Sequence, residues 1–177
     1  MKISVYIATS LDGFIAKPDG DIGWLMESGI PGDKEDYGYA DFISSVDCLV
    51  MGRNTYEKVL SFPEWPYDKK VILLSNTLTD DEIPEKIKEK VELFKGTLQE
   101  LISYLARNKK SRVYIDGGKT IQSFLANGFV TDITLTRIPI LLGSGISLFG
   151  ALPKEIKLNH ISTKSFPSGF VQSVYEI

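Results

Sequence analysis

Apolar residues in this 177-residue chain gather in short runs, and the character of these runs predicts strands. Three runs are almost continuously apolar, as expected of strands covered on both faces, whereas the last alternates like a half-exposed antiparallel strand. The strands predicted from these runs are 3–8, 48–51, 71–74, 113–115, 133–138, 156–161 and 170–177.

Several of the intervals between these strands show a different spacing of apolar residues. Apolar residues recur there at i, i+3, i+4 and i+7, which is the spacing of one face of an α-helix. This spacing predicts helices over 39–46, 98–105 and 121–125. Capping boxes, in which a short polar residue is followed three positions later by Glu, mark two helix starts. The two boxes are Thr97 with Glu100 and Asn54 with Glu57.

The order of these elements predicts an α/β protein. Strands and helices alternate along most of the chain, and further strands follow at its end. Such an order is typical of three layers, with a central, mostly parallel sheet, antiparallel C-terminal strands and flanking helices. No linker, repeat or low-complexity tract interrupts the chain, so residues 1–177 are expected to form a single domain.

Composition excludes several classes of function. With one cysteine (Cys48) and one histidine (His160), the chain cannot assemble a common zinc site, and no metal is expected. A serine-hydrolase triad would need His160, which we interpret instead as an exposed strand residue. The net charge of -3 gives no reason to expect a nucleic-acid partner. No signal peptide or membrane-spanning run is present in the sequence, so a cytoplasmic location without membrane contact is expected.

Two strand–helix junctions contain residues that are candidates for binding phosphate. At the first, Gly52 ends a buried strand and Arg53 places a guanidinium beside the free N–H groups of the next helix. At the second, Gly117 and Gly118 precede a helix, and glycine lets a phosphate approach bare backbone. Neither junction has the P-loop or Rossmann glycine pattern. Each could be purely structural, but two of them in one small domain indicate a dinucleotide.

A third stretch, 10–24, follows the first strand and is rich in turn-forming residues. It reads Ser10-Leu11-Asp12-Gly13, then Gly20-Asp21-Ile22-Gly23, and ends in Trp24. A segment of this kind could close over a bound ligand. A structured surface loop with Trp24 as a hydrophobic plug fits the same pattern.

In this order, the three stretches resemble the dihydrofolate reductase superfamily. The more similar branch contains the C-terminal reductase domain of the bifunctional riboflavin-biosynthesis deaminase-reductase. The resemblance spans nearly the whole chain and includes Ile72-Leu73-Leu74-Ser75 and Leu135-Thr136-Arg137. The segment 139–149, with Leu142-Gly143-Ser144-Gly145 inside it, is more similar to the riboflavin branch than to a folate enzyme. The resemblance implies a dihydrofolate-reductase-like fold.

The resemblance also implies NADPH as the cofactor and suggests which residues hold it. Residues 52–55 match the segment that binds the 2′-phosphate and pyrophosphate, and 117–120 match the other pyrophosphate turn. The full set of matching cofactor positions is Ala8, Trp24, Gly52, Arg53, Asn54, Thr55, Ser75, Gly117, Gly118, Lys119 and Thr120.

Two further matches concern the substrate. Asp36 matches a carboxylate in the first helix of the family's folate enzymes, and Thr136 matches its partner hydroxyl. If Asp36 faces the pocket partly removed from water, its pKa is raised and it can hold or relay a proton. The alternative is that Asp36 is a solvated residue in an acidic helix start, where the helix dipole favours it.

The hypothesis drawn from the sequence is therefore an NADPH-dependent reductase. It would transfer hydride to a pterin-like or ribosylaminopyrimidine-like substrate, and the expected partner is a small heterocyclic molecule. By resemblance, a homodimer is also expected. Two alternatives stay open: a protein that binds a nucleotide or a drug-like ligand without turning it over, and an oligomeric scaffold without any ligand.

Overall fold

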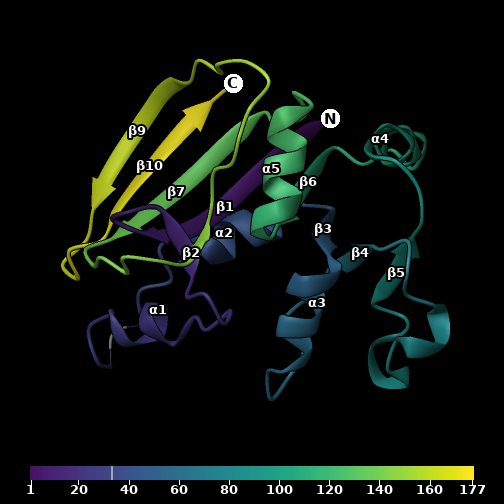
Figure 1. The fold of residues 1–177 in the computed structure, drawn as a ribbon, viewed down its shortest axis with the longest axis horizontal. Helices are drawn as coiled ribbons and strands as arrows, with labels where there is room; N and C mark the ends of the chain where they lie inside the picture. The colour runs from purple at the N-terminus through teal and green to yellow at the C-terminus, as the bar shows by residue number, and fades with distance from the viewer. Residues whose placement is uncertain (33) are drawn as a thin grey trace.

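The computed structural model describes residues 1–32 and 34–177, and its centre is an eight-stranded sheet (Figure 1). The strand order is β5-β4-β3-β6-β1-β7-β10-β9. Strands β5 to β7 in this order run parallel, and β10 is antiparallel to both of its neighbours. The predicted α/β class, with a mostly parallel sheet and antiparallel C-terminal strands, is confirmed.

The large sheet contains β1 Lys2–Ser10, β3 Cys48–Gly52, β4 Lys70–Leu74, β5 Val91–Phe94, β6 Arg112–Asp116, β7 Asp132–Ile138, β9 Asn159–Ser165 and β10 Val171–Glu176. A small second sheet pairs β2 Phe14–Ala16 with β8 Ile146–Ser147. The helices are α1 Gly23–Glu27, α2 Tyr39–Ser44, α3 Arg53–Leu60, α4 Leu98–Arg107 and α5 Gly118–Ala126, with 3₁₀ turns at Asp80–Glu82 and Glu85–Ile87.

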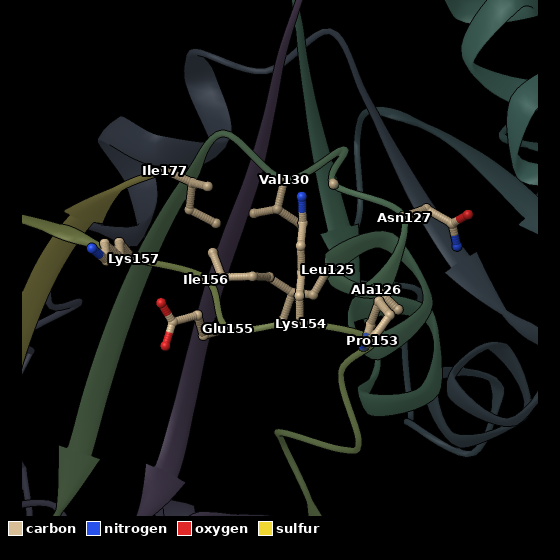
Figure 2. A pocket seen from close by; sticks show the side chains of 11 residues that line it. Leu125, Ala126, Asn127, Val130, Pro153, Lys154, Glu155, Ile156, Lys157 and Ile177 are labelled. Carbon is tan, nitrogen blue, oxygen red and sulfur yellow. The ribbon is translucent and has the colours of Figure 1, made fainter.

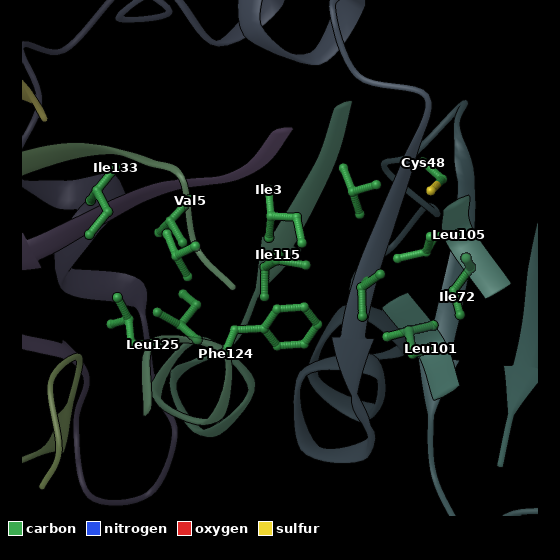
Figure 3. Packing of buried hydrophobic residues seen from close by; sticks show 14 of the residues in the cluster. Ile3, Val5, Cys48, Ile72, Leu101, Leu105, Ile115, Phe124, Leu125 and Ile133 are labelled. Atoms are coloured by element: carbon green, nitrogen blue, oxygen red, sulfur yellow. The ribbon is translucent and has the colours of Figure 1, made fainter. Parts of the chain in front are cut away.

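Helices cover both faces of the large sheet because each face carries its own apolar cluster. On one face, Leu101 of α4 and Phe124 of α5 pack against strand residues such as Val5 and Ile115 (Figure 3). The other face packs against α2 and α3, and its members include Phe42, Leu49, Met51, Tyr56, Val59 and Leu73. These side chains are almost completely removed from water, so burial of apolar surface on both faces stabilises the three layers.

This topology has a switch point at the carboxyl edge of the sheet, which is called the crevice between β3 and β6 below. Strands β3 and β6 are parallel neighbours. The chain leaves β3 for α3 on one face, and it leaves β6 for α5 on the opposite face. Where adjacent strands send their connections to opposite faces, the space between the two connections is the usual ligand site of an open α/β sheet.

Several predicted elements are confirmed and others are wrong. The helix predicted over 98–105 forms, and the Thr97–Glu100 capping box at its start is present. The strand predicted over 156–161 is shifted along the chain: it forms as the edge strand β9, Asn159–Ser165, whose residues are all exposed. His160 lies exposed in that strand, as predicted.

The second capping box, Asn54 with Glu57, does not form. Helix α3 begins at Arg53, its N-cap is Gly52, and no side chain in the described part of the chain caps it. Glu57 instead accepts a hydrogen bond from Arg53, with 2.6 Å between Nε and Oε1. The (i, i+4) ion pair between these two residues has displaced the predicted cap.

Candidate functional site

The crevice between β3 and β6 brings together the N-termini of two helices. The N-cap of α3 is Gly52 and the N-cap of α5 is Gly117, and within residues 1–32 and 34–177 no side chain caps either helix. The first N–H groups of an α-helix have no partner within the helix, and together with the helix dipole they attract an anion. Two such ends at neighbouring strands therefore form a site suited to a ligand with more than one phosphate.

Both junctions have the sequence Gly-x-x-Thr, and the two junctions interlock. A Cβ built on Gly117 would lie 2.0 Å from Oγ1 of Thr55, and one built on Gly52 would lie 2.9 Å from Oγ1 of Thr120. Each threonine hydroxyl thus lies against the N-cap glycine of the other helix. Gly117 also has a φ of 91°, a backbone angle that residues with a side chain rarely adopt. These glycines are required for the close approach of the two turns.

Gly118 corrects the expectation that both glycines of the second junction offer bare backbone to a ligand. Gly118 is buried, and a Cβ built on it would lie 2.8 Å from Cδ1 of Ile15 and 3.4 Å from the carbonyl oxygen of Ser147. The space beside this glycine is therefore filled by the small β2–β8 sheet. What Gly118 can still offer a ligand is its backbone N–H in the first turn of α5.

Arg53 lies where the end of β3 adjoins the end of β4. Its Nη1 donates to Oγ1 of Thr77 at 3.2 Å, while its Nε is paired with Glu57. Oγ of Ser75 accepts the backbone N–H groups of Thr77 and Leu78, which shapes the turn after β4. A guanidinium and two hydroxyl groups therefore meet at the outer end of the crevice. Asn54 and Lys119 are exposed beside it.

A cavity of about 350 Å³ lies over one face of the paired strands β1 and β7 and is called the β1–β7 pocket below. It brings together three residues predicted from sequence: Ala8, Asp36 and Thr136. Ala8 and Thr136 are partners in the β1–β7 ladder, so their side chains lie on the same face of the sheet. The other walls come from α1, the segment before α2, and Phe170.

Trp24 does not line this pocket. Its side chain is 3% exposed and packs in an apolar cluster with Ile138, Phe166 and Phe170. Its buried Nε1 has no hydrogen-bond partner among the residues that the structure describes. Trp24 therefore acts as the hydrophobic plug that was the second interpretation of this stretch of sequence.

Asp36 departs from the sequence expectation in two ways. It lies before α2 rather than within a helix, and it is exposed. Its Oδ1 accepts the N–H of Gly38 and its Oδ2 accepts the N–H of Ala40, both at 2.9 Å. These two hydrogen bonds lower the pKa of the carboxyl group, so the predicted rise in pKa is wrong. Asp36 is a carboxylate at neutral pH, able to accept an N–H group from a ligand.

Sequence reasoning missed a hydrogen-bonded network beneath this pocket. Nε2 of Gln172 lies 3.0 Å from Oγ1 of Thr136, 3.1 Å from Oη of Tyr6 and 3.0 Å from the carbonyl oxygen of Tyr37. The Tyr6 hydroxyl donates to that same carbonyl oxygen at 2.6 Å. No local pattern marks Gln172, because it reaches Tyr6 across three strands and 166 positions of sequence.

Asp116, the last residue of β6, was also missed. Its Oδ1 accepts the N–H of Gly117 at 2.8 Å, and its Oδ2 accepts the hydroxyl of Tyr67 at 3.2 Å. Burial raises the pKa of the Asp116 carboxyl group. A carboxyl group with a raised pKa in a crevice is a candidate proton-handling group. The sequence does contain a signal for Asp116: an acidic residue stands between a buried strand and the paired glycines.

A larger cavity of about 610 Å³ lies near the C-terminal end of α5 (Figure 2). Leu125, Val130, Ile156 and Ile177 converge on its interior, while Lys157 and Asn127 lie at its margin (Figure 2). None of the residues predicted to bind a cofactor or substrate lines it. The residues with phosphate and proton chemistry gather instead at the carboxyl edge of the sheet.

Two negative observations concern residues 1–32 and 34–177. Among them, no group of three or more His, Cys, Asp or Glu side chains is arranged to hold a metal ion. No helix in this part of the chain is long and apolar enough to cross a membrane.

Comparisons with known proteins agree with this architecture. Residues 64–172 match the family model described as the RibD C-terminal domain. The chain is 39% identical over 171 residues to the uncharacterized protein YwjB of Bacillus subtilis (strain 168), covering 93% of this chain and 92% of that one. A crystal structure named "Putative riboflavin biosynthesis protein", from Shewanella sp. PV-4, is 43% identical, with a TM-score of 0.94 over 99% of this chain and 98% of that one.

A more distant structure shares the fold. It is the diaminohydroxyphosphoribosylaminopyrimidine deaminase/5-amino-6-(5-phosphoribosylamino)uracil reductase of Thermotoga maritima, with a TM-score of 0.77 and 14% identity. The match covers 99% of this chain and 56% of that one. The family model, supported by the two relatives of high identity, establishes that the chain belongs to the RibD C-terminal domain family.

Proposed function

We propose that this protein is an NADPH-dependent reductase that transfers hydride to a ribosylaminopyrimidine-like or pterin-like substrate. Membership of the RibD C-terminal domain family supports a reductase-type role. The relative from Shewanella, named for riboflavin biosynthesis, favours riboflavin-type over folate-type metabolism. The observation that carries the proposal is the interlocked pair of uncapped helix N-termini in the crevice between β3 and β6.

The residues of the crevice fit the phosphates of such a cofactor. The N–H groups at the starts of α3 and α5, with the hydroxyls of Thr55 and Thr120, supply donors for a pyrophosphate. Arg53 and Ser75, at the outer end of the crevice, suit a 2′-phosphate, because a guanidinium can donate two parallel hydrogen bonds to a phosphate. NADPH bound there would supply the hydride from its nicotinamide ring.

The β1–β7 pocket is proposed to hold the substrate. Asp36, ionised at neutral pH, would accept an N–H group of the heterocycle, and Thr136 would contact it from β7. Apolar side chains such as Leu25 and Phe170 would exclude water from the ring. Because the pKa of Asp36 is lowered, we assign it to orienting the substrate. Asp116, whose pKa is raised, is the better candidate to hold a proton.

We further propose that the protein is a homodimer. All seven residues of the edge strand β9 are exposed, and Ile161 in that strand is 54% exposed. An exposed edge strand offers unpaired backbone groups that a second copy could cover. Light scattering coupled to size exclusion measures the mass directly, and a monomeric mass across micromolar concentrations would contradict this part of the proposal.

The test of function uses NADPH, NADH and a small panel of substrates. NADPH at about a hundred times its dissociation constant should stabilise the protein by about 2.7 kcal/mol, which a melting experiment detects readily. An aminopyrimidine or dihydropterin that is a substrate should then consume NADPH absorbance. Binding without consumption across the panel would favour the non-catalytic nucleotide-binding alternative. Equal stabilisation by NADH would remove the 2′-phosphate role of Arg53.

A further inference from the structure

The carboxyl group of Asp116 lies at the base of the two helix starts that form the crevice between β3 and β6. Asp116 ends β6, and its Oδ1 accepts the N–H of Gly117, the N-cap of α5, at 2.8 Å. Gly117 in turn lies against Thr55 in the first turn of α3. A negative charge on Asp116 would therefore stand close to both helix starts at which the phosphates of a dinucleotide are proposed to bind.

The tyrosines that surround this carboxyl group do not neutralise it. Its Oδ2 accepts the hydroxyl of Tyr67, from the segment before β4, at 3.2 Å. Tyr114 on β6 and Tyr39 on α2 also interact electrostatically with Asp116. Burial first, and the charge of Asp116 second, raise the pKa of all three tyrosines. Their hydroxyl groups therefore stay protonated and uncharged at neutral pH.

The cations near the crevice do not pair with Asp116 either. Arg53 on α3 is paired with Glu57, and Lys119 on α5 is exposed. Among the residues that the structure describes, no lysine or arginine forms an ion pair with Asp116 or acts on its pKa. Burial raises the pKa of this carboxyl group, and its two hydrogen bonds only partly oppose the rise. An ionised Asp116 is thus a partly buried anion without a countercharge.

We propose that Asp116 takes up a proton when a dinucleotide binds at the two helix starts, so that cofactor binding is coupled to neutralisation of this carboxyl group. The phosphates bring negative charge to the helix starts and displace water from them. Both changes disfavour a carboxylate, because like charges repel and loss of water penalises the charged form. The proton comes from the solvent and adds to a carboxylate oxygen, and no other bond changes. The helix starts then face the phosphates without a competing negative charge.

This inference rests on the proposed cofactor and adds a pH dependence to its binding. A ligand that raises the pKa of Asp116 must bind more weakly once the pH exceeds the pKa of ligand-free Asp116. Relative to Asp116→Asn, whose amide is neutral at every pH, the NADPH affinity of the wild type should fall by up to about tenfold per pH unit. The 2′-phosphate of NADPH also titrates, with a pKa of about 6, but it does so equally in both proteins.

The test is calorimetric titration of NADPH into the full chain across the pH range in which the protein is folded. Titrations in buffers of low and high ionisation enthalpy count the protons that are taken up. The wild type should take up as much as about one proton more than Asp116→Asn. Asp68→Asn is the matched control, because it removes an exposed carboxyl group next to Tyr67 in the sequence, and its proton uptake should equal that of the wild type.

A second variant keeps the test available if Asp116→Asn does not fold. Tyr67→Phe retains the ring and removes a hydrogen bond that favours the carboxylate form of Asp116, so the pKa of ligand-free Asp116 should rise further. The pH at which NADPH affinity begins to fall should therefore move upward in Tyr67→Phe.

Three results would overturn the inference. They are equal proton uptake in the wild type and Asp116→Asn, an unmoved pH profile in Tyr67→Phe, and failure of the full chain to bind NADPH. The outcome for the proposed function is separate. If NADPH binds with the additional proton but no substrate ever consumes it, the proposed reductase fails and the coupling stands. If NADPH is consumed while wild type and Asp116→Asn take up equal numbers of protons, the reductase stands and the coupling fails.

Discussion

Helices α4 and α5 begin at the same edge of one sheet and cover the same face, yet their N-termini are built differently. In α4, Thr97 accepts the N–H of Glu100, and the Glu100 carboxylate accepts the N–H of Thr97 at 2.7 Å. In α5, the corresponding positions are Gly117 and Thr120, and no side chain caps the first turn.

The third residue of each helix explains this difference. Glu100 reaches back to its own N-cap, whereas the hydroxyl of Thr120 lies against Gly52 at the start of α3. One helix thus satisfies its own first turn, and the other leaves its N–H groups for a ligand. The comparison teaches that a binding site in this fold can be recognised by the absence of local capping where capping would be easy.

The largest expected effect comes from Gly117→Ala. A methyl group there would meet Thr55 and would also force a side chain into a φ of 91°. Backbone strain and overpacking each cost about 1–3 kcal/mol, so we expect a loss of about 3 kcal/mol or more in urea unfolding. Adding Thr55→Ala should recover part of this loss.

The control for that substitution is Gly128→Ala. Gly128 has φ of 70°, but a Cβ built on it meets nothing within 4 Å. The Gly128→Ala variant should lose only the stability that the backbone strain costs, about 1 kcal/mol. Equal losses in Gly117→Ala and Gly128→Ala, with no recovery on adding Thr55→Ala, would show that the contact between the two turns carries no energy.

Arg53→Gln should have the next largest effect, on cofactor binding. A hydrogen bond to a charged group contributes about 1.5–3 kcal/mol, so NADPH should bind at least about tenfold more weakly while NADH is unaffected. Calorimetric titration of both cofactors measures this. Arg107→Gln, an exposed substitution at the end of α4, should change neither affinity. A parallel loss of NADH affinity in Arg53→Gln would assign Arg53 to the pyrophosphate instead.

Thr97→Ala and Thr120→Ala sharpen the comparison between α4 and α5 directly. Removing the cap of α4 should cost about 1 kcal/mol of stability and leave NADPH affinity unchanged. Thr120→Ala should have the opposite profile, with NADPH affinity reduced severalfold. Thermal unfolding with and without NADPH measures both quantities on the same samples. Matching profiles for the two variants would remove the functional distinction between the helix starts.

The smallest effect concerns Asp116 and pH. Its pKa in the folded protein is raised above the unfolded value of about 3.9, so the protonated form is favoured by folding. The stability it contributes is therefore full below the unfolded pKa and is lost as pH rises through the folded pKa. Relative to Asp116→Asn, the wild type should lose stability as the pH rises above about 4, the unfolded pKa. Parallel stability–pH curves for the two proteins would contradict the raised pKa.

Much of the fold was predictable because its signals are local. The apolar runs at 48–51, 71–74 and 113–115 become buried central strands. Strand β5, Val91–Phe94, was missed because only Val91 in it is buried and a charged residue interrupts its apolar side chains. The capping box predicted at Asn54 did not form because Glu57 pairs instead with Arg53, one helical turn away.

The candidate site was less predictable because its contacts depend on strand register. Ala8 pairs with Thr136, and Thr136 pairs with Gln172, across three strands from distant parts of the sequence. A pattern along the chain cannot reveal which residues such a ladder brings together. The direction of the pKa shift of Asp36 was equally hidden, because it is set by two backbone N–H groups of its own turn.

The reciprocal contacts between the two Gly-x-x-Thr junctions restrict the order in which the sequence can change. An alanine at Gly117 is tolerable only in a chain whose Thr55 has already become smaller, and the same holds for Gly52 and Thr120. The two junctions lie more than 60 positions apart in the sequence, yet a change in one sets which changes the other accepts. Related chains should therefore change these positions in pairs, with the threonine first and the glycine second.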